Sequence, residues 1–302
     1  MNQKTKIIAA DLREIKAAQI SIAGAVIIFL VSLTVGIMID SVALLLDAGT
    51  GFVILLMTFW VRSIIRKIHS PPDHRYNFGY EKYEPLTMAL QNSAIIFTCV
   101  IGLAFAVQDI VHPDHIASYG LATVATFGCT IIAIGLAFYL LKVSKETGSQ
   151  LLKTSAKQWL IDSSLSIGMF AGFFVGFLLL RSGHSNIAAY LDPGLAIALA
   201  FAVMRFPLKA LAANIRELLD SVPAQKIHEK IVKIVEKHKS NFSGLHRMRI
   251  RKAGKKTFLE VGFTVHGAMT IAQAQALAED FERELAHEVP NCDTVVYFKR
   301  AQ

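Results

Sequence analysis

The chain has 302 residues, of which 53% are hydrophobic and 18% are charged, and its mean hydropathy is +0.46. A composition this apolar excludes an ordinary soluble enzyme of the same length and predicts a polytopic membrane protein. The formal net charge of +8 is typical of a membrane protein with basic cytoplasmic loops, and it gives nucleic-acid binding little support.

Six apolar runs are long enough for a helix to cross a bilayer. The connections between them alternate, because one set is rich in Lys and Arg and the other holds only Arg181. Since short basic loops stay in the cytoplasm, we expect both termini on the cytoplasmic side. The runs cover residues 18–38, 41–63, 86–109, 117–141, 160–180 and 187–210. The basic connections hold Lys4, Lys6, Arg13, Lys16, Arg62, Arg66, Lys67, Arg75, Lys82, Lys142, Lys145, Lys153 and Lys157.

The first residues and the cysteines carry no further signal. Charges continue through position 16 without the apolar core and cleavage site of a signal peptide, so we expect this segment to be retained. Cys99, Cys129 and Cys292 lie far apart and without CxxC spacing. Their spacing indicates neither a disulfide framework nor a thiolate metal site.

A carboxylate, Asp47, lies inside the second apolar run. Placing a charged side chain near the middle of a membrane costs at least about 2.5 kcal/mol of free energy, so a charged residue there usually has a functional role. The alternative is a buried carboxylate that only holds helices together. Asp162 lies in the fifth run, and two such residues suggest one shared cation site.

Neighbouring polar residues extend this site. Gln158 and Asp162 are four apart and therefore share a helix face. Asp47 and Thr50 are three apart, and Gly51 leaves space beside them. The spacing predicts that two facing helices supply Asp47, Asp162 and Gln158, with Thr50 as a further oxygen donor.

The connection from Ser70 to Glu84 is the most distinctive one in the chain. Pro71 and Pro72 stop a helix because neither ring nitrogen can donate a hydrogen bond. By composition alone this segment is a solvated connector. The segment from Lys142 to Lys157 is likewise polar, and we expect a loop that leads into the fifth span.

Pro223 divides the sequence into a transmembrane domain of residues 1–222 and a cytoplasmic domain of residues 223–302. Beyond it, periodicity predicts a helix over 224–237, a hairpin of alternating strands over 245–251 and 259–265, a helix capped by Thr270, and a strand over 294–298. Ile271, Ala274, Leu277, Phe281 and Leu285 form the apolar stripe of that second helix. The order αββαβ predicts a small two-layer domain.

A basic stripe follows the hairpin. Nucleic acid or lipid could bind it, but a solvated strand face is the favoured interpretation. Its members are Arg247, Arg249, Arg251, Lys252, Lys255 and Lys256.

Several motifs occur in an order that specifies a family. A Ser and small or apolar residues precede Asp47, a Phe-Gly-x-x-Lys-x-Glu pattern spans 78–84, and Asp162 follows in the fifth span. Asp192-Pro193 begins the sixth span, and Leu218-Leu-Asp220 with Pro223 ends it. With six spans and an αββαβ tail, the chain resembles the cation diffusion facilitators, which export divalent metals in exchange for protons. The resemblance implies a ferredoxin-like tail, a homodimer, a bacterial inner membrane and no enzymatic activity or tightly bound cofactor.

The resemblance also implies a tetrahedral metal site from two helices. Its four positions correspond here to Asp47, Gly51, Gln158 and Asp162, so two of the usual Asp or His ligands are replaced. Zinc prefers imidazole, thiolate and carboxylate ligands, whereas oxygen-rich sites suit Mn²⁺, Fe²⁺ or Mg²⁺. We therefore expect a hard divalent cation rather than zinc. Glutamine does not titrate, so any proton exchange must use the two Asp residues.

The family's auxiliary metal sites are also altered. In the loop Asp73 remains, but Tyr76 and Tyr80 occupy the usual histidine positions, and His74 is out of register. In the tail, His246 matches one of the metal ligands that the resemblance implies, whereas other residues stand at the remaining ligand positions. We therefore expect a dimer held by apolar packing, and a pair between Lys82 and Asp220 where membrane and tail meet. The replaced tail positions are Gly262, Gln275, Tyr297 and Lys299.

Two other functions compete with metal export. A relative that has lost transport and kept a structural or partner-binding role would explain the missing ligands. An intramembrane aspartyl hydrolase would also place two Asp residues in separate helices, but the chain lacks a Gly-x-Gly-Asp context.

Overall fold

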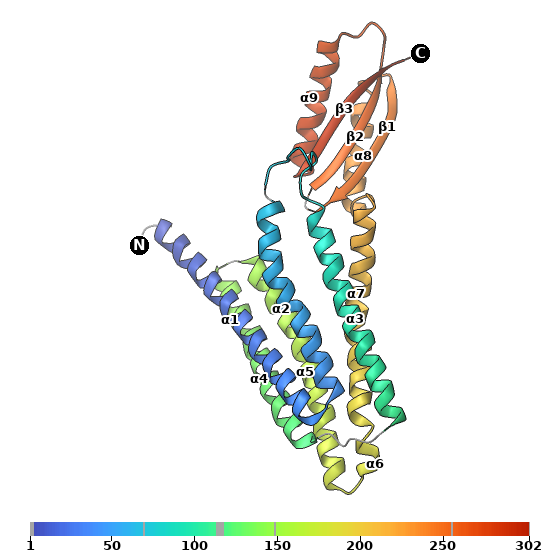
Figure 1. Ribbon diagram of the computed structural model, residues 1–302. Coiled ribbons are helices and arrows are strands. Elements are labelled where there is room, and N and C mark those ends of the chain that lie inside the picture. Colours follow the sequence, from blue (N-terminus) through green and yellow to red (C-terminus); the bar gives the residue numbers. More distant parts are fainter. Residues whose placement is uncertain (1–2, 69, 113–117, 148, 255, 302) are drawn as a thin grey trace. The chain divides into compact units, whose positions relative to one another are not determined.

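The computed structural model describes residues 3–68, 70–112, 118–147, 149–254 and 256–301 (Figure 1). The chain divides into two compact units: Met1–Trp60 with Gln91–Leu208, and Val61–Leu90 with Lys209–Gln302. The expected boundary at residue 222, between a transmembrane and a cytoplasmic domain, stays a prediction. Several basic side chains counted above lie outside the described part: Lys4, Lys6, Arg62, Arg66, Lys67 and Lys255.

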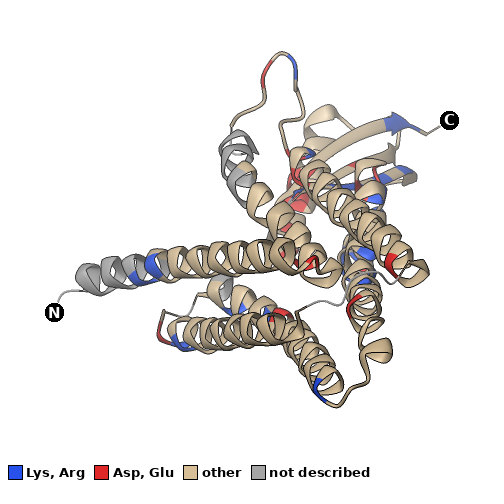
Figure 2. Cartoon of the chain, turned by 60° about the horizontal axis from the view of Figure 1, so that its bottom comes forward, with Lys and Arg blue, Asp and Glu red and all other residues tan. Residues whose placement is uncertain are grey.

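Long apolar helices form the transmembrane domain, as the sequence predicts. Five described helices are long and apolar enough to cross a membrane, and α2 contains the shorter apolar helix Val42–Met57. Beyond Lys16, α1 contains no Lys, Arg, Asp or Glu, and Figure 2 colours that part of the helix tan. The helices are α1 (Gln3–Ile39), α2 (Val42–Ile68), α3 (Tyr83–Val111), α4 (Tyr119–Thr147), α5 (Gln150–Arg181), α6 (Ser185–Ala188) and α7 (Leu191–Leu218).

The polar segment between α4 and α5 is helical, which corrects the expected loop from Lys142 to Lys157. α4 continues to Thr147 and α5 begins at Gln150. Lys, Glu and Gln are good helix formers, so the charged residues extend both helices beyond their apolar parts. Ser149 separates them by capping α5, because its side chain accepts a hydrogen bond from the backbone N–H of Leu152.

Within the first unit, α4 packs along α1 and α5. Gly24 permits the close approach of α1, because a Cβ there would lie 2.3 Å from Cδ1 of Leu136. The indole N–H of Trp159 donates to the Ser21 hydroxyl at 2.8 Å and links α5 to α1. A buried apolar cluster fills the contact between the three helices: Ala17, Leu140, Val143, Leu152 and Ala156.

The second unit contains the expected αββαβ domain, and its hairpin and final strand are confirmed. Strands β1 and β2 pair antiparallel and β3 joins β2 in parallel, in the order β1-β2-β3. Figure 1 shows α8 and α9 beside this sheet. The elements are α8 (Gln225–Lys239), β1 (Gly244–Ala253), β2 (Lys256–Val265), α9 (Ile271–Glu288) and β3 (Cys292–Arg300).

The alternating residues of β2 supply much of the core of this domain. Leu259, Val261 and Phe263 are buried, and they share one apolar cluster with Phe281 of α9. Thr270 and Gln273 form a capping box at the start of α9, as Thr270 predicts. Ile271 is 84% exposed, so the apolar stripe of α9 begins one turn later than expected.

The turn between β1 and β2 is held at Gly254. Its φ of +58° lies in the left-handed region, and a Cβ there would lie 2.8 Å from the carbonyl oxygen of Glu81. Its backbone N–H donates to Oε1 of Glu217 at 2.7 Å. The turn therefore packs against the connection before α3 and against the end of α7.

Gly254→Ala should destabilise the second unit. A left-handed backbone costs an alanine about 1–2 kcal/mol, and the backbone oxygen of Glu81 leaves no space for the new methyl. We expect a lower thermal midpoint for the purified protein, measured by fluorescence or circular dichroism. Gly244→Ala is the matched control, because its Cβ would meet no atom closer than 4.0 Å. Equal midpoints for the two variants would contradict the packing described for the turn.

Candidate metal centre

Asp47 lies on α2 and is half-buried. The hydroxyl of Ser32, on α1, donates to its Oδ2 at 2.9 Å. The thiol of Cys129, on α4, faces the Ser32 hydroxyl and lies within electrostatic range of Asp47. Three helices therefore surround the Asp47 carboxylate with a hydroxyl and a thiol.

Asp162 lies on α5, within electrostatic range of Asp47. It is exposed, and so is Gln158 one turn earlier on the same helix. No hydrogen bond joins Gln158 to Asp47 in the described part of the chain. The two carboxylates thus interact electrostatically, and Gln158 lies one turn from Asp162 on the exposed face of α5.

Thr50 and Gly51 differ in what they offer to the site. The hydroxyl of Thr50 donates to the carbonyl oxygen of Asp47 at 2.9 Å, so it is engaged by its own helix. A Cβ at Gly51 would lie 4.0 Å from Cβ of Phe29, an ordinary contact that leaves space for a side chain. Among the described residues, no three His, Cys, Asp or Glu side chains are grouped closely enough to hold a metal ion.

Sequence reasoning missed Ser32 and Cys129 as neighbours of Asp47. Ser32 is a polar residue inside an apolar run, which is the signal that could have identified it. Cys129 lies in another apolar run, where a thiol behaves as a small apolar side chain. Nothing in its spacing relates it to Asp47, because the two helices meet only in the folded chain.

A further carboxylate, Asp192 at the start of α7, has a structural role. It is 4% exposed and accepts from the Ser41 hydroxyl at 2.5 Å and from the backbone N–H of Val42 at 2.8 Å. Both donors stand at the N-terminus of α2, where a negative charge is favourable. The sequence identified Asp192 as the beginning of a span but did not identify this cap.

The connection before α3 is ordered around Asp73. This carboxylate accepts from the backbone N–H of Arg75 and of Tyr76 at 2.8 Å, and from the Tyr80 hydroxyl at 2.5 Å. The hydrogen bond to Asp73, with burial, raises the pKa of Tyr80 to about 12. Tyr80 and Glu81 are 7% and 8% exposed, so this end of the segment is packed rather than solvated.

Lys82 and Asp220 form the expected ion pair, with Nζ 3.0 Å from Oδ1. Arg251 Nη1 lies 3.0 Å from the same oxygen, and its guanidinium stands 5.1 Å from the ring centre of Phe78 and 4.6 Å from that of Phe258. One carboxylate at the end of α7 thus joins the connection before α3 to strand β1.

The basic stripe is only partly solvated, which corrects the expected strand face. Lys252 Nζ lies 2.8 Å from Glu217 Oε2, and Lys256 pairs with Glu81. Arg247 and Arg249 remain exposed. Four of the six residues of the stripe therefore pair with carboxylates of their own chain: Arg249, Arg251, Lys252 and Lys256.

Gly262 and Tyr297, two tail positions at which the resemblance implies metal ligands, lie against each other. Tyr297 lies across Gly262, whose Cβ would stand 2.4 Å from the Tyr297 Cζ. The His246 ring meets Tyr297 edge-on, with centres 6.3 Å apart. Tyr297 thus occupies the space that a side chain at position 262 would need.

Comparison with known proteins shows to which family the chain belongs. Residues 18–219 match the model of the cation efflux transmembrane domain, and residues 223–299 match that of the cation efflux protein cytoplasmic domain. The chain belongs to the cation diffusion facilitator family. Its members are cation efflux transporters rather than enzymes, and this chain is an integral membrane protein with a metal ion as its substrate.

Individual relatives are distant but span most of the chain. Protein p34 of Rickettsia rickettsii (strain Sheila Smith) is 23% identical over 282 residues, which are 93% of this chain and 90% of the relative. The cation-efflux pump FieF of Escherichia coli O1:K1 is 22% identical over 264 residues, 87% of this chain and 83% of the pump. A solved structure of CzrB is 23% identical, covers 27% of this chain and 100% of its own, and has a TM-score of 0.25.

The ion pairs of Asp220 make a pH-dependent contribution to stability. Burial opposes its ionisation, but hydrogen bonds from Arg251 and Lys82 outweigh burial and hold its pKa below the ordinary value of 3.8. A carboxyl with a lowered folded-state pKa stabilises the fold above its unfolded-state pKa, and this stabilisation is lost as the pH falls through the folded-state pKa. Asp220→Asn, which tolerates the residue's φ of 59°, should therefore lower the thermal midpoint near neutral pH.

The difference from the unmodified protein should stay constant above about pH 5 and shrink as the pH falls below 3.8 and through the lowered folded-state pKa, measured as thermal midpoints across that range. Asp280→Asn is the control, because Asp280 pairs only with exposed Arg283 one turn away. A constant difference at every pH would contradict the role of the ionised Asp220.

Proposed function

We propose that this protein exports a hard divalent cation across a bacterial inner membrane in exchange for protons. Asp47 and Asp162 bind the ion, which is substrate rather than cofactor. The observation that carries this proposal is the approach of two carboxylates, on α2 and α5, inside apolar helices. Membership of a cation efflux family supports the direction of transport.

Alternating access of this site to the two sides of the membrane would move the ion. Gln158 does not titrate, so Asp47 and Asp162 are the site groups that can carry protons in the opposite direction. Asp162 is exposed in this conformation, which suits an open, ion-accepting state. The Ser32 hydroxyl orients Asp47 while the site is open.

The proposed preference for Mn²⁺ or Fe²⁺ over Zn²⁺ follows from the donors. Two carboxylates, the Gln158 amide and the Thr50 hydroxyl are oxygen ligands, which hard cations favour. Thr50 must leave its hydrogen bond with the Asp47 carbonyl to take part. Cys129 is a soft donor nearby, and the proposal places it outside the ligand set.

We further propose a homodimer with both termini in the cytoplasm. The match to the cation efflux cytoplasmic domain supports the dimer, and the basic connections support the orientation. Tyr297 over Gly262 and the replaced ligands favour apolar packing rather than metal ions between the two tails.

One observation favours a second candidate, a family member that has kept a structural or partner-binding role without transport. Among the described residues, no three typical ligand side chains meet around a metal-sized space. Gly51 and Gln158 stand where two stronger ligands would complete that group.

Flux measurements separate the two candidates. In vesicles containing the purified protein, a manganese gradient should drive proton movement, read from a pH-sensitive dye. Asp47→Asn and Asp162→Asn should each reduce this flux to that of empty vesicles, because each removes a charged ligand and a proton carrier. Asp40→Asn is the control, because Asp40 is exposed at the turn after α1 and Asn also tolerates its φ of 54°.

Absence of both metal flux and proton flux in the unmodified protein would favour the structural candidate, whereas flux that is unchanged in both Asp variants would remove Asp47 and Asp162 from the transport site. Metal flux that proceeds without any dependence on pH would remove proton exchange from the proposal.

A panel of divalent metals tests the ligand set. The unmodified protein should bind and transport Mn²⁺ or Fe²⁺ in preference to Zn²⁺, and combined Gly51→Asp and Gln158→His should shift this preference toward zinc. The space at Gly51 accommodates the first change without a backbone clash. Cys129→Ser should leave the order of metals unchanged. The site would have softer donors than proposed if zinc were the best substrate of the unmodified protein. A selective loss of zinc transport in Cys129→Ser would lead to the same conclusion.

A further inference from the structure

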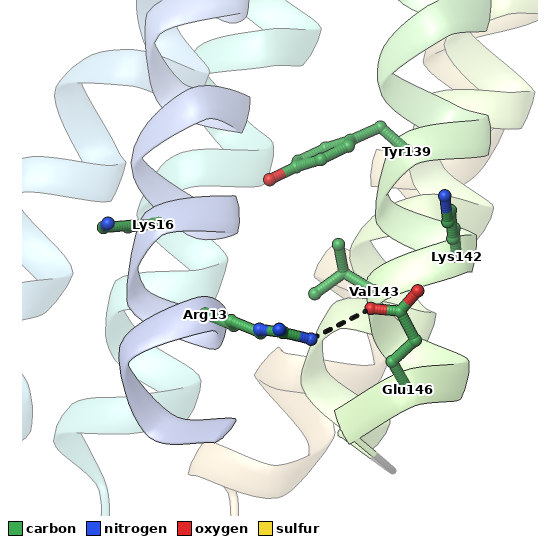
Figure 3. A pocket seen from close by; sticks show the side chains of 6 residues that line it. All are labelled: Arg13, Lys16, Tyr139, Lys142, Val143 and Glu146. Carbon is green, nitrogen blue, oxygen red and sulfur yellow. Dashed lines mark hydrogen bonds and ion pairs between the residues drawn. The ribbon is translucent and has the colours of Figure 1, made fainter. Parts of the chain in front are cut away.

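A pocket of about 380 Å³ lies between α1 and α4, away from the carboxylate site. Figure 3 shows Arg13 reaching from α1 toward α4, and Tyr139 reaching from α4 toward α1. The pocket is lined by Arg13 and Lys16 of α1 and by Tyr139, Lys142, Val143 and Glu146 of α4.

The lining carries three cations and one carboxylate. Arg13 Nη1 lies 3.5 Å from Glu146 Oε2, and these side chains are 67% and 43% exposed, so the pair is long and contributes little to stability. In the described part of the chain, Lys16 and Lys142 make no ion pair. The pocket therefore has an excess of positive charge that a phosphate could neutralise.

The pocket stands where the apolar parts of two antiparallel helices end. Arg13 and Lys16 flank the beginning of the span Ile15–Ile39, and Lys142 and Glu146 lie in the last turns of the span Tyr119–Thr147. This is the level of lipid head groups at the basic side of the membrane.

Apolar surface continues from the pocket toward the middle of the membrane. Ile20, one turn beyond Lys16, is 45% exposed, and Phe138, beside Tyr139, is 62% exposed. A free anion would use only the charged end of this surface. A molecule with a charged head and acyl chains would use both parts.

We propose that this pocket binds the head group of an anionic phospholipid. The Arg13 guanidinium can hold two phosphate oxygens at once, the Lys142 ammonium adds a second charge, and the Tyr139 hydroxyl can donate to a third oxygen. The phosphate takes the place of Glu146 as the partner of Arg13. The acyl chains then lie along Ile20 and Phe138.

Native mass spectrometry of the full-length protein in detergent tests this site. Phosphatidylglycerol should remain bound at concentrations at which phosphatidylcholine does not. Arg13→Gln with Lys142→Gln should weaken phosphatidylglycerol binding roughly 10–30-fold, because each cation near a membrane surface contributes to the binding of anionic lipid. Lys153→Gln with Lys157→Gln is the matched control, because it removes two exposed cations of α5 and should leave affinity unchanged.

Glu146→Gln separates binding from folding. It removes the carboxylate that competes for Arg13, so it should strengthen phosphatidylglycerol binding, a change that a misfolded protein cannot produce. Unchanged or weaker binding in Glu146→Gln, equal losses in the two double variants, or equal retention of the two lipids would overturn the proposal. Displacement of the lipid by millimolar inorganic phosphate would assign the pocket to a free anion instead.

Discussion

The cost of placing a carboxylate in an apolar medium governs the membrane part of this protein. Asp192 offsets that cost by accepting hydrogen bonds from the Ser41 hydroxyl and from the N-terminus of α2, and it is buried. Asp47 accepts a hydrogen bond from the Ser32 hydroxyl, and Asp162, within electrostatic range of Asp47, remains exposed. The carboxylate with several donors holds helices together, whereas the two with fewer donors are the ones that we propose as the cation site.

Opposite charges organise the second unit in another way. Individual surface ion pairs contribute little, and those of Lys82 and Lys252 are partly exposed. Here several pairs converge on the end of α7, and Gly254 adds a backbone hydrogen bond and close packing. Arg251 also stacks on two aromatic rings, a contact that a lysine would make less well. The convergence, rather than any one pair, fixes the hairpin turn to the ends of the helices.

Local patterns in the sequence predicted most of the fold. The alternation of Leu259, Val261 and Phe263 identified β2, and Thr270 identified the start of α9. The predicted loop from Lys142 to Lys157 was wrong because polarity was taken to end a helix, although its residues favour one. The neighbours of Asp47 could not be predicted from local sequence patterns. Ser32 and Cys129 reach it through contacts between helices that no local pattern records.

Gly51 and Gln158 stand at two positions where the resemblance implies other metal ligands, and this proposed change concerns side-chain chemistry. A Cβ at Gly51 would lie 4.0 Å from Cβ of Phe29, so close packing at the Cβ position does not require a glycine there. The helix that carries Gln158 and Asp162 would present a histidine at position 158 on the same face. Family membership establishes cation efflux, whereas the identity of the cation depends on the residues of the site. The proposal of a hard ion therefore rests on the proposed donors themselves, two carboxylates with neutral oxygens.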